Sequence, residues 1–223
     1  MKGKAKKVAE PQPQDIPRPS NRLVRIDAQR NLDSLLRAAL IVFEESGVDA
    51  PVREIAEKAG VGIGTMYRHF PERSDLIKAV VRQEIDDCMQ AGQMLADKHR
   101  DAPGEALALW MQRLVDLVKT KRGLGPALHS GNPAYQSLPD YFLSSLAPVM
   151  QNLLDAAKSA GVIRPDVEAK ELLLAGTRLA APASEGDVAQ ARRMVALLVD
   201  GLRFGTVAGN TAPASVSTSA ASV

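Results

Sequence analysis

The stretch from residue 60 to residue 70 decides the fold, and it reads Gly60-Val61-Gly62-Ile63-Gly64-Thr65-Met66-Tyr67-Arg68-His69-Phe70. Its glycines indicate a turn, and Thr65 to Phe70 then predicts a short helix that Pro71 ends. Upstream, Pro51 opens another short helix whose apolar residues run to Ala59. Two short helices joined by a glycine-containing turn are the parts of a helix-turn-helix.

Helical periodicity continues on both sides of this motif. Apolar residues recur at helical spacing from Ala28 to Ser46, and Gly47 then ends this supporting helix. A long helix is expected from Ser74 to about Lys98. Similar patterns predict further helices over 103–122, 142–161, 166–181 and 187–204. No segment alternates apolar and polar residues as a strand would, so we expect an all-α fold of about nine helices.

The two ends of the chain differ in composition from its middle. Residues 1–21 include four prolines among lysine, glutamine and serine, and residues 208–223 are mostly alanine, serine, threonine and valine. Neither stretch has enough apolar surface to offset the entropy of ordering it, so we expect both to be disordered. The functional residues should therefore lie between them.

Basic residues are concentrated at the start of the chain. Residues 1–30 contain eight lysine or arginine residues and three acidic residues, a formal charge of +5, within a chain whose net charge is +2. A basic arm of this kind suits contact with a phosphate backbone. A tail that only improves solubility has the same composition, so both interpretations stay open.

The composition also indicates a compartment. A membrane span needs about 18 consecutive apolar residues, and no such run occurs; nor does an apolar stretch follow the basic residues near Met1, as in a secretory signal. Cys88 is the single cysteine, so no intrachain disulfide can form. We therefore expect a cytosolic protein in which Cys88 is a buried structural thiol.

A longer pattern surrounds the helix-turn-helix. It comprises Leu36-Arg37-Ala38-Ala39, Phe43, Gly47, Ile55-Ala56, Ala59-Gly60-Val61, Thr65-Met66-Tyr67-Arg68-His69-Phe70, Arg73 and Leu76. In this order and spacing, the pattern resembles the DNA-binding domain of the TetR/AcrR family of repressors over residues 30–81. The resemblance implies a DNA-binding domain over residues 22–81 and a helical-bundle domain for ligand binding and dimerisation over residues 82–207. The arm 1–21 and the tail 208–223 would flank these two domains.

The resemblance also implies how such a protein works. A homodimer would repress transcription from a pseudo-palindromic DNA operator and would leave it when a small-molecule effector binds, with no cofactor. The protein would be cytoplasmic, and associated with the nucleoid while bound to DNA. Three further segments are similar to a subgroup with an SbtR-like C-terminal domain: Lys121-Arg122-Gly123-Leu124, Pro133-Ala134-Tyr135 and Asp200-Gly201-Leu202-Arg203.

Ten residues form the expected DNA-contact surface. They are Arg30, Arg53, Gly62, Ile63, Gly64, Thr65, Tyr67, Arg68, His69 and Arg73. The start of the recognition helix would present backbone N–H groups to phosphates or base edges, and Ile63 suits a thymine methyl group. Tyr67 and His69 resemble the family's phosphate-binding pair, and Arg73 stands where the family usually has a lysine. Gly62 departs from the family, in which a serine is common there, so one hydroxyl contact is lost.

The C-terminal half contains two expected sites. The effector pocket would combine aromatic and apolar side chains with a few polar ones: Trp110, Met111, Leu114, His129, Tyr135, Phe142, Leu146 and Met150. Taken singly, each of these also fits an ordinary bundle core. The last two helices have more apolar surface than one core-facing stripe needs. This excess favours a symmetric interface between two copies, formed by Leu173, Leu174, Met194, Leu197, Leu198 and Leu202.

Two other classes of function have different sequence requirements. An enzyme would need paired carboxylates with matching histidines, a glycine-rich phosphate loop or an activated nucleophile, and the sequence shows none of these patterns. His69, His99 and His129 also lack the spacing of metal ligands, so no metal site is expected. A DNA-binding activator, or a regulator without a small-molecule ligand, remains the alternative, because the motif fixes contact with DNA and not the sign of regulation.

Overall fold

The computed structural model describes residues 21–181 and 188–204, and these residues form helices and connecting turns without a strand. The elements are α1 (Asn21–Ser46), α2 (Val52–Lys58), α3 (Ile63–His69), α4 (Arg73–Lys98), α5 (Pro103–Gly123), α6 (Gly125–Leu128), the 3-10 helix η1 (Pro133–Tyr135), α7 (Leu138–Ser159), α8 (Ala169–Leu179) and α9 (Val188–Phe204). The predicted all-α fold is confirmed. Apart from Asn21, the arm and the tail that we expected to be disordered lie outside the described residues.

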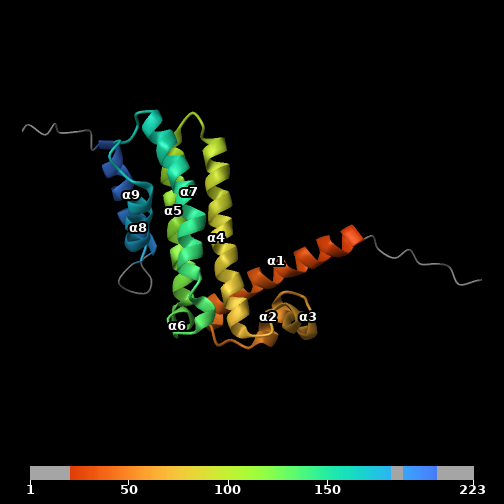
Figure 1. Ribbon diagram of the computed structural model, residues 1–223. Coiled ribbons are helices and arrows are strands. Elements are labelled where there is room, and N and C mark those ends of the chain that lie inside the picture. The colour runs from red at the N-terminus through yellow and green to blue at the C-terminus, as the bar shows by residue number, and fades with distance from the viewer. Residues whose placement is uncertain (1–20, 182–187, 205–223) are drawn as a thin grey trace, which may run out of the picture.

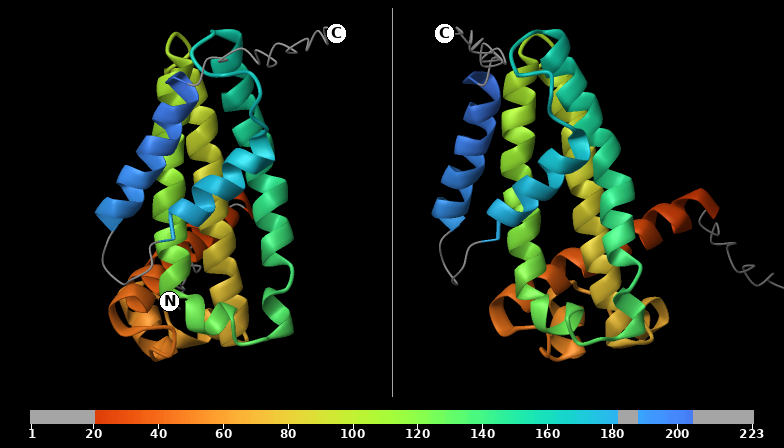
Figure 2. Two further views of the ribbon diagram at one scale, coloured as in Figure 1. Left: turned by 90° about the vertical axis from the view of Figure 1, so that its left-hand side faces the viewer. Right: turned by 60° about the vertical axis from the view of Figure 1, so that its left-hand side comes forward.

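Three long helices form the body of the molecule. α4, α5 and α7 run side by side, and α8 and α9 cover one side of them (Figure 1). α1, α2 and α3 gather at the foot of this body, and the N-terminal half of α1 projects on the side opposite α9 (Figure 2). The buried apolar residues form one continuous cluster from α1 to α9. Within the described ranges, no helix is both long and apolar enough to cross a membrane.

The helix boundaries differ from the prediction where the motif is concerned. α1 begins at Asn21, about two turns before the expected Ala28. The recognition helix α3 begins at Ile63 and includes Gly64, which the glycine pattern had assigned to the turn. Gly60 is the residue that makes the turn, because its φ of +69° is unfavourable for residues with a side chain. α4 is continuous across the predicted domain boundary at residue 81.

Packing holds the two short helices of the motif in place. α2 and α3 have seven residues each, and isolated helices of this length do not persist in water. Ile55 of α2 and Met66 of α3 are completely buried, in the same apolar cluster as Phe43 of α1 and Leu76 of α4. Burial of one such side chain contributes about 1.5–3 kcal/mol. The motif is therefore stable because α1 and α4 pack against it.

Arg73, the first residue of α4, braces the loop between α1 and α2. Its guanidinium donates hydrogen bonds to the backbone carbonyl oxygens of Val48 and Ala50, with 2.7 Å between Nη2 and the Ala50 oxygen. The next residue, Pro51, precedes α2 and makes no side-chain capping hydrogen bond. The entry into α2 is thus fixed by a charged side chain that comes from α4.

The body is packed around Trp110 of α5. The indole is completely buried, and its Nε1 donates a 2.9 Å hydrogen bond to the carbonyl oxygen of Cys88 in α4. One turn further along α4, a Cβ atom at Gly92 would lie 2.7 Å from Trp110 Nε1 and closer still to Val149 of α7. Three helices therefore meet at a point where only glycine fits. Burial raises the pKa of the Cys88 thiol to about 12.

Gly92→Ala is expected to lower the free energy of unfolding by about 1–3 kcal/mol, because the added methyl group overpacks the contact with Trp110 and Val149. Gly64→Ala is the matched control, since a Cβ atom at this helical position meets nothing within 4 Å. That change should stabilise the protein by up to about 1 kcal/mol. Urea unfolding followed by circular dichroism measures both. A Gly92→Ala variant as stable as the parent would contradict the packing described above.

Arg73→Gln is expected to lower the free energy of unfolding by about 2 kcal/mol, because two hydrogen bonds from a charged donor to the loop are lost. Arg68→Gln removes the same group from an exposed position in α3 and should change stability by less than about 0.5 kcal/mol. Thermal and urea unfolding compare the two variants. Equal stabilities would show that Arg73 does not brace the loop.

Candidate nucleic-acid interface

α3 directs one side to the core and the other to solvent. Met66 is completely buried, whereas Ile63 is 43% and Tyr67 is 53% exposed. Ile63 and Tyr67 are four residues apart, so they are neighbours on the helix surface. Two large side chains exposed together on so short a helix make this side of α3 a candidate contact surface.

Hydrogen-bond donors accompany these two side chains. Arg68 and His69 are exposed in the last turn of α3, and the His69 ring lies against Phe70, with 6.2 Å between the ring centroids. At the other end, Gly62 precedes the helix and provides no side-chain cap for its first N–H groups. The exposed side therefore offers donors at both ends, and donors match the phosphate oxygens and base acceptors of DNA.

Arg53 adds positive charge from α2. Its side chain is exposed and pairs with Glu57 one turn later in the helix, with 3.2 Å between Nε and Oε1. An ion pair this exposed to water contributes little to stability. A phosphate group can therefore take the place of Glu57 at small cost.

Most of the ten predicted DNA contacts lie together. Seven of them occupy the stretch 62–69, and Arg53 lies on the adjoining helix α2. Arg30 is exposed in the N-terminal half of α1. Arg73 differs from the others, because two backbone carbonyl oxygens of the α1–α2 loop occupy its guanidinium. The structure thus gives Arg73 a bracing contact inside the protein, and its predicted contact with DNA stays a prediction.

The predicted effector-pocket residues do not line one common cavity among the residues that the structure describes. Five of the eight are completely buried in the body core: Trp110, Met111, Leu114, Leu146 and Met150. His129 is exposed, and Phe142 is half-buried. Tyr135 lines a separate hollow of about 440 Å³ between the start of α4 and the α6–η1 segment. Arg73 and Asn132 also line this hollow, and the sequence had not indicated either as a ligand contact.

The predicted dimer residues divide into an inner and an outer group. Leu173 and Leu202 are buried within their own chain, so they support α8 and α9 from inside. Leu174 and Leu198 are half-buried. Met194 and Leu197 are exposed on α9 and are the two of this set that leave most apolar surface in contact with water.

Two family models match the chain. Residues 35–80 match the model for bacterial regulatory proteins of the tetR family, and residues 102–204 match the C-terminal domain of SbtR-like transcriptional regulators. An HTH-type transcriptional regulator from Staphylococcus aureus (strain USA300) is 27% identical over 128 residues, which cover 53% of this chain and 69% of that protein.

Solved structures extend the likeness to both halves of the chain. The TetR transcriptional regulator SCO0520 from Streptomyces coelicolor is 37% identical with a TM-score of 0.66, and the match covers 77% of this chain and 97% of that one. The TetR transcription regulatory protein from Mycobacterium vanbaalenii is 33% identical with a TM-score of 0.61, covering 81% and 99%. These matches confirm the resemblance inferred from the sequence: the chain belongs to the TetR family of transcriptional regulators.

Proposed function

We propose that this regulator is a homodimeric repressor that binds a pseudo-palindromic DNA operator and releases it when a small-molecule effector binds. The observation that carries the proposal is the solvent side of α3, where Ile63 and Tyr67 are exposed between donor groups at both ends. The protein would act in the cytoplasm, on the nucleoid while it is bound to DNA, and would have no catalytic role.

The exposed side of α3 has the chemistry to enter the major groove of DNA. Ile63 would contact a thymine methyl group, and Arg68 would reach a base edge or the backbone. Tyr67 and His69 would donate hydrogen bonds to phosphate oxygens, which fixes the register without reading the sequence. Arg53 would add a phosphate contact from α2.

A second copy of the chain would cover the apolar side of α9. Leu197 is 64% and Met194 39% exposed, and the half-buried Leu174 and Leu198 add apolar surface from α8 and α9. A two-fold pairing of α8 and α9 with their copies would bury these side chains and present two α3 helices to the same DNA duplex. Two equivalent half-sites follow, which is why we propose a pseudo-palindromic operator.

The effector would act through α4, which runs from the DNA-binding motif into the body. Arg73 at its start braces the motif, and Gly92 further along lies against Trp110 in the body core. A ligand that prefers one arrangement of the body would move α4 and change the spacing of the two α3 helices.

A regulator without a small-molecule ligand is the second candidate, because the body core is closely packed. Trp110 and four other predicted pocket residues are completely buried there. Thermal-shift measurements against a broad collection of metabolites separate the two candidates. A compound that raises the melting temperature and weakens operator binding supports effector release, whereas no stabilising compound favours the ligand-free regulator.

Tyr67→Phe combined with His69→Ala should weaken binding to operator and to unrelated DNA by a similar factor, because both contacts are to phosphates. Neither side chain is a permanent cation, so the slope of log affinity against log salt concentration should change little. Ile63→Ala should instead weaken operator binding more than binding to unrelated DNA, since this contact reads a base. Fluorescence anisotropy at several salt concentrations measures the DNA affinity of the parent and of both variants. Arg100→Gln, just beyond the far end of α4, is the control. Unchanged binding of the double variant would remove the phosphate role.

Leu197→Glu should yield monomers, because a carboxylate would have to be buried in the proposed interface. The side chain is 64% exposed in the single chain, so the substitution should leave the fold intact. Met94→Glu is the matched control, since Met94 is 65% exposed on α4, away from α8 and α9. Sedimentation velocity measures the assembly of both variants. A Leu197→Glu protein that still sediments as a stable dimer would refute the interface.

A further inference from the structure

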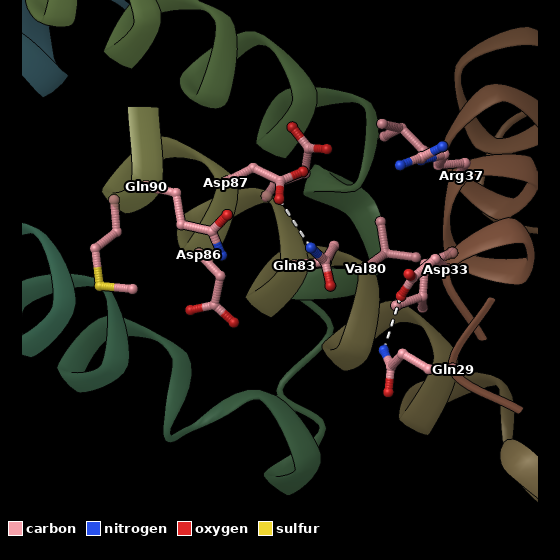
Figure 3. A pocket seen from close by; sticks show the side chains of 12 residues that line it. Gln29, Asp33, Arg37, Val80, Gln83, Asp86, Asp87 and Gln90 are labelled. Carbon is pink, nitrogen blue, oxygen red and sulfur yellow. Dashed lines mark hydrogen bonds between the residues drawn. The ribbon is translucent and has the colours of Figure 1, made fainter. Parts of the chain in front are cut away.

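A polar groove lies between the projecting helix α1 and the middle of α4 (Figure 3). Its volume is about 560 Å³. Asp33, Glu84, Asp86 and Asp87 contribute four carboxylates to its lining and Arg37 one guanidinium, a formal charge of −3. Neither the proposed DNA contacts nor the proposed dimer contacts use this surface.

Neutral partners orient two of these carboxylates. Asp33 accepts a 2.8 Å hydrogen bond from Gln29, and Asp87 accepts a 2.8 Å hydrogen bond from Gln83 (Figure 3). An amide donor positions a carboxylate but brings no positive charge to it. Both aspartates therefore keep their negative charge within the groove.

The pKa of Glu84 depends on the charges around the groove. Burial raises the pKa of its carboxyl group, Arg113 of α5, 3.7 Å away, lowers this pKa, and the charge of Asp87 raises it again. Asp86 accepts a 2.5 Å hydrogen bond from the hydroxyl of Tyr141, and the Arg82 guanidinium lies over the Tyr141 ring, 4.6 Å from its centroid. Four carboxylates therefore stand against the three guanidinium groups of Arg37, Arg82 and Arg113. The groove thus has an excess of negative charge that a cationic segment would balance.

The chain contains a complementary segment near its start, thirteen residues before α1. Residues 1–7 read Met-Lys-Gly-Lys-Ala-Lys-Lys, with four lysines and no acidic residue. The thirteen residues 8–20 connect this segment to Asn21 and can span up to about 43 Å. At 1.5 Å per helical residue, Gln29 and Arg37 lie about 12 Å and about 24 Å along α1 from Asn21. The connection 8–20 is therefore long enough for the lysine-rich segment to reach back to the groove.

We propose that the groove between α1 and α4 binds the lysine-rich segment 1–7 of the same chain. The lysine ammonium groups face the groove carboxylates and join α1 to α4, and the covalent connection makes weak individual pairs sufficient. The same lysines are then withheld from DNA phosphates, because one ammonium group cannot neutralise both. The groove therefore limits how much the arm adds to non-specific DNA affinity, and salt weakens the docking.

A paired-cysteine crosslink tests the docking in the full-length chain without DNA. Ala5→Cys places a thiol among the lysines, and Gln90→Cys places one in the groove lining. Cys88 does not compete, because its side chain is completely buried and burial raises the pKa of its thiol to about 12, whereas the thiolate is the reactive form. At low ionic strength, an intrachain disulfide should form at least about fivefold faster than in a chain with Ala5→Cys and Gln151→Cys, whose second thiol lies on the exposed side of α7.

Asp33→Asn with Asp87→Asn tests the charges, because these changes keep the shape of the groove. They should slow the disulfide about fivefold and raise the affinity for non-operator DNA. Asp155→Asn with Glu171→Gln is the matched control. Asp155 accepts a 2.8 Å hydrogen bond from Gln151, just as the groove aspartates do from their glutamines, but it lies on α7, and Glu171 is exposed on α8.

The control variant should form the disulfide at the parent rate. Equal rates for the two cysteine pairs, or a rate that Asp33→Asn with Asp87→Asn leaves unchanged, would overturn the proposal. A crosslinked product of twice the chain mass would overturn it as well, because the groove would then bind the arm of another copy.

Discussion

The surface that α3 presents depends on the burial of Met66. A helix of seven residues has no stability of its own, and α3 has no side-chain cap at its N-terminus. Met66 is completely buried and therefore sets the rotation of the helix about its axis. Tyr67 follows Met66 by one residue, about 100° around the helix, and is therefore turned toward solvent. Ile63 lies beside Tyr67, four residues earlier, and is exposed in the first turn of the helix. The buried side of α3 thus determines which side chains form the candidate DNA interface on its exposed side.

α4 depends on the same kind of constraint over a longer distance. At its start, Arg73 holds two carbonyl oxygens of the loop that leads into α2. In its middle, Gly92 allows Trp110 and Val149 to approach so closely that no side chain fits. A helix fixed at both places moves as a unit, because closely packed contacts switch between arrangements and do not deform gradually. This stiffness is what would couple the body to α3.

The sequence predicted the helices well, because their apolar residues recur with the helical period over long segments. It placed the start of α1 too late, since the residues after Asn21 follow a proline-rich stretch whose composition gives no helical signal. The role of Arg73 could not be read from the sequence, because its partners are backbone carbonyl oxygens 23 and 25 residues earlier. Periodicity also cannot distinguish the wall of a cavity from a packed core, so Trp110 fitted the predicted pocket and the observed core alike.

Charge determines whether the lysines of the arm bind the groove or DNA. DNA carries about one negative charge per 1.7 Å of helix axis and surrounds itself with counterions that binding releases. The groove between α1 and α4 offers only four fixed carboxylates, one of them already facing Arg113. Lysines in the proposed docked arm would therefore stay in the groove until a duplex lies close enough to compete for them. Contacts between the arm and phosphates do not depend on the base sequence, so docking of the arm in the groove would reduce affinity for every DNA sequence equally. The contacts of α3 would then contribute a larger share of the preference for the operator.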